Sequence, residues 1–201
     1  MSVKSLLLFL FLLPFAAQAG PRIEHWQTAN GAEVYFVAAP ELPIVDVQVV
    51  FDAGSARAGN TPGVALLTAG LLSDGAQTAN GELGSDEIAE RFAGLGALFG
   101  ASADRDMATV SLRSLTDTKL LQPALDTLAL LLSQPTFPAG SFERERKRML
   151  IGLQAQEQSP ADIAGKAFYT ALYGNHPYAT QPLGTVEGVN KLTRADVVAH
   201  H

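Results

Sequence analysis

Hydrophobic and polar positions alternate along several stretches of the chain, and this period of two predicts β-strands. Asn30-Gly31, a dipeptide that accepts positive φ in a tight hairpin turn, separates the first two stretches. The polar turn Asp104-Arg105-Asp106 separates the last two. We therefore expect five strands, at residues 23–28, 33–38, 44–53, 97–103 and 107–115.

The other segments repeat their apolar residues every three or four positions, which predicts helices. We expect Thr61 to cap the first helix, with Pro62 in its first turn, and Ser85 to cap the second. The predicted helices run from Thr61 to about 73, from Ser85 to about 95, and over residues 117–133, 141–156 and 160–173. Strands, helices, paired strands and helices in this order predict an α+β domain with helices packed on a mainly antiparallel sheet.

The first 19 residues have the form of an export signal. Lys4 precedes an apolar run over residues 6–17, and Ala17-Gln18-Ala19 is a small-x-small cleavage pattern. The run is shorter than the roughly 20 residues that a helix needs to cross a bilayer, so a retained membrane anchor is the weaker alternative. We expect cleavage after Ala19, no transmembrane span after cleavage, and a bacterial periplasmic protein without cysteines.

The last residues suggest a longer protein. Thr193 to Asp196 has the form of a capping box, yet the sequence stops at His201, about eight residues into that helix, where an isolated helix is marginal. We expect residues 20–201 to be a single domain and about the first half of a two-domain chain. The alternative is a frayed terminal helix in a complete protein.

Composition and short motifs exclude several functions. The 201 residues include 20 acids against 14 bases, which argues against a nucleic-acid surface. Gly94-x-Gly96 with Gly100 lacks the third glycine of a dinucleotide-binding loop, because Phe99 stands there. No two of the four histidines lie four apart on a helix, so no local zinc motif is present. The alternating charges at 143–148 fit a solvated helix face or the charged edge of a site.

Several short motifs in a fixed order nevertheless resemble a known family. The motifs are Val50-Phe51-Asp52-Ala53-Gly54-Ser55, Thr61-Pro62-Gly63-Val64-Ala65, Glu145-Arg146, His176-Pro177-Tyr178 and Leu183-Gly184-Thr185. Together they are similar to the N-terminal domain of the pitrilysin or insulinase family, the inverzincins of peptidase family M16. The resemblance runs from about Ile23 to the end, and it implies the fold of a pitrilysin-family metallohydrolase domain.

The resemblance also shows what this chain has lost. Active members carry His-x-x-Glu-His on the first helix, where the histidines bind zinc and the glutamate activates water. Leu66 and Gly70 stand at the histidine positions here, and Ala69 stands at the glutamate. Only Glu145, 75 positions after Gly70, matches the third ligand. One carboxylate cannot hold a catalytic zinc, so we expect no catalytic residue and no zinc, with Glu145 as a helix-surface or ion-pairing residue.

A degenerate chain of this family implies a partner. Many two-subunit members pair a zinc-bearing chain with a degenerate one, and the two enclose unfolded peptides. We expect a chain inactive alone that helps to form this peptide-binding chamber, with zinc on the partner subunit. By the same resemblance, the segment Gly100, Ala101, Ser102 and Ala103 corresponds to the edge strand that pairs with substrate. Two alternatives stay open, namely a scaffold or assembly protein without a proteolytic role and a metallopeptidase with ligands outside this sequence.

Overall fold

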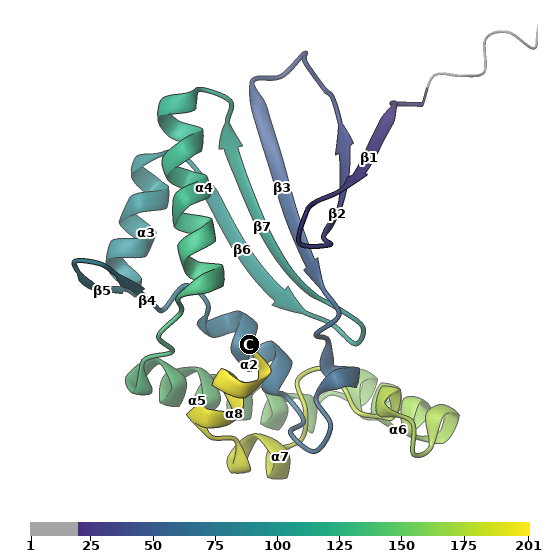
Figure 1. Cartoon of the computed structure of the whole chain (residues 1–201). Coiled ribbons are helices and arrows are strands. Elements are labelled where there is room, and N and C mark those ends of the chain that lie inside the picture. Colours follow the sequence, from purple (N-terminus) through teal and green to yellow (C-terminus); the bar gives the residue numbers. More distant parts are fainter. Residues whose placement is uncertain (1–19) are drawn as a thin grey trace, which may run out of the picture. The chain divides into compact units, whose positions relative to one another are not determined.

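The computed structural model describes residues 20–201 and divides them into two compact units, residues 20–43 and 44–201 (Figure 1). The predicted export signal, with its cleavage after Ala19, lies outside the described residues. All strand pairs of the described part are antiparallel and helices accompany them, so the predicted α+β class is confirmed. Within residues 20–201, no helix combines the length and apolar character needed to cross a membrane. The expectation of a single domain in a longer chain stays a prediction.

The first unit is the expected hairpin of β1 (Ile23–Gln27) and β2 (Glu33–Val37). Thr28 and Ala32 close its loop, since the Thr28 amide donates to the Ala32 carbonyl at 2.9 Å. Of the Asn-Gly pair in the loop, only Gly31 has a positive φ, at 89°. The turn is therefore longer than a two-residue connection, with the glycine alone in the left-handed region.

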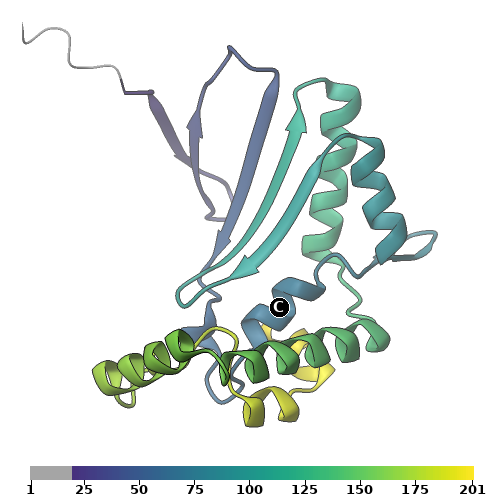
Figure 2. The same cartoon turned by 180° about the vertical axis from the view of Figure 1, so that it is seen from behind.

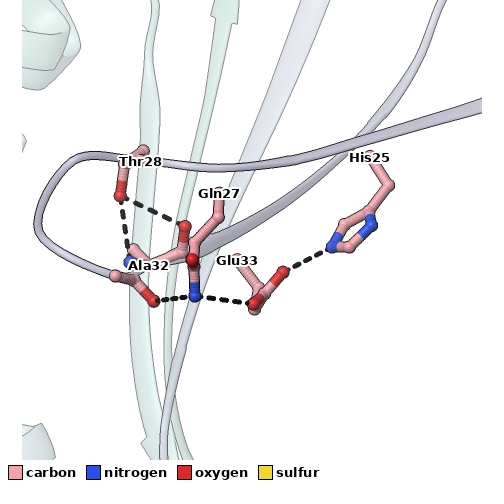
Figure 3. Close-up of polar contacts among 6 residues, drawn as sticks. His25, Gln27, Thr28, Ala32 and Glu33 are labelled. Atoms are coloured by element: carbon pink, nitrogen blue, oxygen red, sulfur yellow. Dashed lines mark hydrogen bonds and ion pairs between the residues drawn. The ribbon is translucent and has the colours of Figure 1, made fainter.

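Polar side chains of β1 and β2 next to this loop form hydrogen bonds between the two strands (Figure 3). The Glu33 carboxylate lies 2.5 Å from Nε2 of His25 and accepts from Nε2 of Gln27 at 3.0 Å. The His25 ring stacks on Tyr35 with centroids 4.4 Å apart. His25 is thus an exposed strand residue with partners in its own hairpin.

The second unit is built on a three-stranded sheet in the order β3-β7-β6, with β3 (Ile44–Phe51), β6 (Leu98–Ala103) and β7 (Ala108–Leu115). Burial alternates along β7, which turns one face of the sheet toward the helices and the other toward solvent. On the solvent face, Arg113 donates from Nε and Nη2 to the two carboxylate oxygens of Asp46 at 2.6 and 2.8 Å. The β6 strand pairs with β7 alone among the described strands, so it is an edge strand.

Helices α3 (Ser85–Gly94) and α4 (Thr118–Ser133) lie on the inner side of the sheet, with α4 along β7 (Figure 1). The sequence pattern did not predict the hairpin of β4 (Gly75–Thr78) and β5 (Gly81–Gly84) that precedes α3. These strands have four residues each and are rich in glycine, which leaves too little alternation to detect.

The other helices gather at one end of the sheet, where β6 and β7 meet α2 (Figures 1 and 2). They are η2 (Ser55–Arg57), α2 (Val64–Leu71), α5 (Ala139–Gln156), α6 (Pro160–Tyr173), η3 (Pro177–Ala179), α7 (Val186–Lys191) and α8 (Arg194–His200). The hydrophobic core between them and the sheet includes Leu67, Leu71, Leu112 and Leu131, which expose at most 1% of their surface.

Helix starts agree with the sequence in three cases and differ in three, one of which is α5, which begins at Ala139 rather than at residue 141. Asp117, Ser159 and Thr193 each cap a helix by accepting a backbone N–H bond. Thr61 does not cap α2, because its hydroxyl donates to the Ala58 carbonyl at 2.6 Å and Gly63 is the N-cap. Ser85 lies inside α3, whose N-cap is Gly84, and the Glu87 carboxylate accepts from the Gly84 amide at 2.9 Å.

Candidate functional site

Helix α2 carries the three positions at which the resemblance places catalytic groups. It is short and apolar, and it begins after Gly63, whose φ of 94° reverses the chain direction where most residues would be strained. Ala69 is buried, whereas Leu66 and Gly70 are partly buried and lie one turn apart on the same side of the helix. All three side chains lack a metal donor and a titratable group.

Glu145 on α5 lies directly over Gly70. Helix α5 packs against α2, and a Cβ atom at Gly70 would be 3.1 Å from Oε1 of Glu145 and 3.3 Å from its Cδ. Figure 2 shows α5 next to α2. The structure therefore brings together two of the residues that the sequence paired across 75 positions.

The Glu145 carboxylate is paired with a cation of its own helix. Arg148 Nη2 lies 2.6 Å from Oε2 and 2.7 Å from Oε1, and Arg148 Nε donates to Oε1 at 3.2 Å. The Glu145 side chain is 17% exposed and that of Arg148 is 74% exposed, so the guanidinium shields the carboxylate from the solvent side. This is the ion-pairing role that the sequence left open for Glu145.

The residues around Gly70 do not fit a zinc ion. Catalytic zinc takes about three protein ligands plus water, and only Glu145 offers a donor here. Among residues 20–201 no group of three or more His, Cys, Asp or Glu side chains is placed to hold a metal. His200 and His201 are turned to backbone carbonyls, with Nε2 at 3.2 Å from Ala53 O and 3.1 Å from Leu132 O. These residues therefore support no reaction step that depends on a bound metal.

The predicted substrate strand, Gly100 to Ala103, lies in the edge strand β6 beside α2. An antiparallel edge strand leaves alternate N–H and C=O groups free of its one neighbour, so a peptide can add to it as a further strand. Ser102 and Ala69 line the same hollow of about 150 Å³ between the sheet, α2 and α8. The substrate assignment of these residues stays a prediction.

Sequence reasoning missed how firmly the turn after β6 is held. The Ser55 and Ala56 amides donate to the carbonyls of Asp104 and Arg105, both at 2.8 Å. Gly54 permits this approach, because a Cβ atom there would lie 2.3 Å from the Arg105 carbonyl oxygen. The signal was present in the Gly54-Ser55 motif, yet its contact with a turn 50 residues away required the fold.

Aromatic side chains from α6 and η3 cover the other side of this turn. The Arg105 guanidinium carbon is 4.1 Å from the centroid of the Tyr169 ring, a cation–π contact. The Tyr178 hydroxyl donates to Asp106, and this hydrogen bond to a carboxylate raises the pKa of Tyr178 above its ordinary value. Nδ1 of His176 accepts a hydrogen bond from the Tyr178 amide at 3.2 Å, and His176 is the N-cap of η3.

Helix α6 differs from an ordinary surface helix because large apolar side chains on it are exposed. Its half-buried residues include Tyr169 and Tyr173, and none of its residues is buried. Three apolar residues of this helix, Ile163, Phe168 and Leu172, are nevertheless exposed by 52, 61 and 59%. An amphipathic helix normally places its apolar stripe toward the core, so α6 presents an apolar surface to solvent.

The fold places helices on an antiparallel sheet, and α2, where the resemblance expects the metal-binding motif, offers no metal ligand at positions 66, 69 and 70. A family model described as Insulinase (Peptidase family M16) matches residues 34–186. The chain belongs to this family, as the motifs in the sequence indicated.

Solved structures and a curated relative agree with this assignment. The peptidase M16 inactive domain of Pseudomonas fluorescens is 43% identical with a TM-score of 0.85, and the match covers 90% of this chain and 43% of that chain. The periplasmic protease PqqL of Escherichia coli is 19% identical with a TM-score of 0.76 over 90% of this chain and 20% of its own, which shows the fold alone.

An uncharacterized zinc protease of Mycobacterium leprae is 30% identical over 81 residues, or 40% of this chain and 18% of the relative. The chain thus spans less than half the length of these relatives.

Proposed function

We propose that this chain is the non-catalytic subunit of a periplasmic, heteromeric zinc metallopeptidase. In this role it helps to enclose unfolded peptides in a chamber shared with a partner that carries an intact His-x-x-Glu-His motif. The chain itself binds no zinc and cleaves no peptide.

One observation carries the proposal, namely the composition of the site on α2 and α5. Leu66, Ala69 and Gly70 supply neither a metal ligand nor a base, and the remaining carboxylate of Glu145 is bound to Arg148. Peptide hydrolysis needs an activated nucleophile, which a metal-bound water or a general base must generate. The fold is retained while this chemistry is missing, so a role in binding or assembly fits better than catalysis.

Two relatives support the non-catalytic character and the periplasmic location that we propose for this chain. The Pseudomonas fluorescens relative is described as an inactive domain, and the Escherichia coli relative is described as a periplasmic protease. The expected export signal fits the same compartment. In both relatives the matched region covers less than half of the chain, so further protein surrounds this fold there.

The outer side of α6 offers a surface for such a partner. Phe168 and Leu172 lie one turn apart and form an exposed apolar stripe on this helix. Buried apolar surface drives stable association of subunits, and about 25 cal/mol is gained for each Å² removed from water. The free edge of β6 supplies the second element, because it can hold an extended peptide.

Co-expression with an intact family member from the same genome tests the proposal. We expect no cleavage of casein or an unstructured peptide by either chain alone, and chelator-sensitive cleavage by the purified pair. Elemental analysis should find zinc in the pair and none in this chain alone. A partner with Gln in place of the glutamate of its motif should abolish cleavage without separating the subunits.

Two substitutions on α6 provide a matched comparison within this chain. Phe168→Glu introduces a charge into the apolar stripe and should weaken association at least about tenfold. Lys166→Glu changes more charge on the same helix, away from the stripe, and should leave association within about twofold.

The outcomes separate the proposal from its alternatives. Stable association without any cleavage would favour a scaffold or assembly protein. Zinc bound at one ion per chain, with cleavage by this chain alone, would show that it is an enzyme. Failure of the two chains to associate would refute the proposed subunit role.

A further inference from the structure

Gly70 lies where α2 packs against α5, at a position where the resemblance expects a metal-binding histidine. A Cβ atom at this position would lie 3.1 Å from Oε1, 3.3 Å from Cδ and 3.5 Å from Cγ of Glu145. The whole end of the glutamate side chain therefore covers the glycine. Any larger residue at position 70 would push the carboxylate back by a few tenths of an ångström, because contacts this short are tighter than ordinary van der Waals packing.

Arg148 fixes the carboxylate in that place. Its guanidinium approaches both oxygens of Glu145, with Nη2 at 2.6 Å from Oε2 and at 2.7 Å from Oε1. A carboxylate that ligates a metal must offer a lone pair directed at the ion. In this chain the guanidinium supplies the positive charge that a zinc ion would supply, and it does so from one turn away on the same helix.

We propose that Gly70, Glu145 and Arg148 form a locked unit that excludes zinc independently of the missing histidines. Arg148 takes the place of the metal as the counter-charge, and Gly70 provides the space into which the carboxylate folds. Restoring His-x-x-Glu-His on α2 is then insufficient to restore a metal site. The cation on α5 must be removed as well.

Zinc binding by restored variants tests this unit directly. The first variant combines Leu66→His, Ala69→Glu and Gly70→His, and the second adds Arg148→Leu. The control adds Arg144→Leu to the first variant instead, because Arg144 is also an exposed cation of α5 but faces Asp74 at 3.6 Å.

We expect the second variant to bind zinc at least about tenfold more tightly than the first, the scale of effects of groups that hold a metal ligand. The control should resemble the first variant. Titration with zinc against a competing chelator measures these affinities without any activity assay. Equal affinity of the first and second variants would overturn the proposal, and so would the absence of zinc from a folded second variant.

A thermal unfolding cycle in the unmodified site keeps the test open if a restored variant fails to fold. Gly70→Ala should lower the melting temperature in the native background, since the new methyl group displaces Glu145. In an E145A background the same substitution should raise it, because alanine favours a helix more than glycine does. A loss of similar size in both backgrounds would show that Glu145 is not what keeps position 70 small.

The inference concerns this chain alone, so it can fail without affecting the proposed subunit role. Conversely, loss of association with a catalytic partner would leave the locked unit standing. The zinc titration and the co-expression assay therefore report on separate claims.

Discussion

Gly54→Ala should strongly destabilise the protein. A Cβ atom at Gly54 would lie 2.3 Å from the Arg105 carbonyl oxygen and 2.5 Å from the carbonyl carbons of Arg105 and Asp106. These are backbone atoms, so no side-chain rotation relieves the overlap. The φ of −75° and ψ of 177° at Gly54 suit any residue, so the penalty comes from the contact and not from backbone strain.

The magnitude follows from what the turn would lose. Moving the turn away breaks two hydrogen bonds, from the Ser55 and Ala56 amides, each contributing about 0.5–1.5 kcal/mol. Leaving it in place forces an overlap of the kind that costs about 1–3 kcal/mol in packed interiors. We expect a loss of about 2–4 kcal/mol in the free energy of unfolding, or about 4–16 °C in melting temperature for a domain of this size.

Calorimetry or urea unfolding of Gly54→Ala measures this loss. Gly165→Ala in α6 and Gly94→Ala in α3 are matched controls, because a Cβ atom at either position meets no heavy atom within 4 Å. Both controls should be neutral or stabilising by up to about 1 kcal/mol, owing to the helix preference of alanine. If Gly54→Ala unfolds within about 0.5 kcal/mol of the native chain, the docking of the turn on residues 54–56 does not hold β6 as argued.

Three further predictions address the core, a cap and a charge pair. Leu67→Ala removes a fully buried side chain and should cost about 2–5 kcal/mol in urea unfolding, whereas Leu172→Ala on the exposed side of α6 should change it by less than about 0.5 kcal/mol. Thr193→Ala removes both the side-chain cap of α8 and the hydroxyl partner of its capping box, so stability should fall by about 1 kcal/mol with faster amide exchange in that helix. The hydrogen bond and charge of Arg113 hold the pKa of Asp46 below its ordinary value, so the pair stabilises the fold above the ordinary carboxyl pKa and loses this contribution as pH falls through the lowered one. Arg113→Gln should raise the Asp46 pKa toward its ordinary value in a carbon-13 titration, and an unchanged pKa would contradict the assignment.

The sequence predicted most elements of the fold because their periodicity is strong. The alternation in residues 44–53 and 107–115, the helix predicted over residues 160–173 and the capping box at Thr193 correspond to observed elements. The misses have local causes. Thr61 has the side chain of a cap, but the positive φ of Gly63 moves the helix start two residues on, and φ is invisible in a residue pattern.

The candidate site divides in a similar way. The resemblance to the family located Leu66 and Ala69 at positions without catalytic groups, and it correctly paired the helices that carry Gly70 and Glu145. The ion pair between Glu145 and Arg148 could not be predicted from the sequence. A run of alternating charges offers several partners at helical spacing, and only packing against α2 selects one.

Helix α6 shows why tertiary structure was needed to find the apolar surface. Phe168 and Leu172 lie one turn apart, and the usual rule would turn such an apolar pair toward the core. Instead Tyr169 of α6 packs against Arg105 of the β6–β7 turn, and Phe168 and Leu172 stay exposed. The amides of Ser55 and Ala56 also hydrogen-bond to this turn. Both the edge strand β6 and helix α6 are therefore held in place through the turn. A change that loosens the turn, such as Gly54→Ala, should therefore weaken both peptide binding along β6 and association through α6, whereas Phe168→Glu should affect association alone.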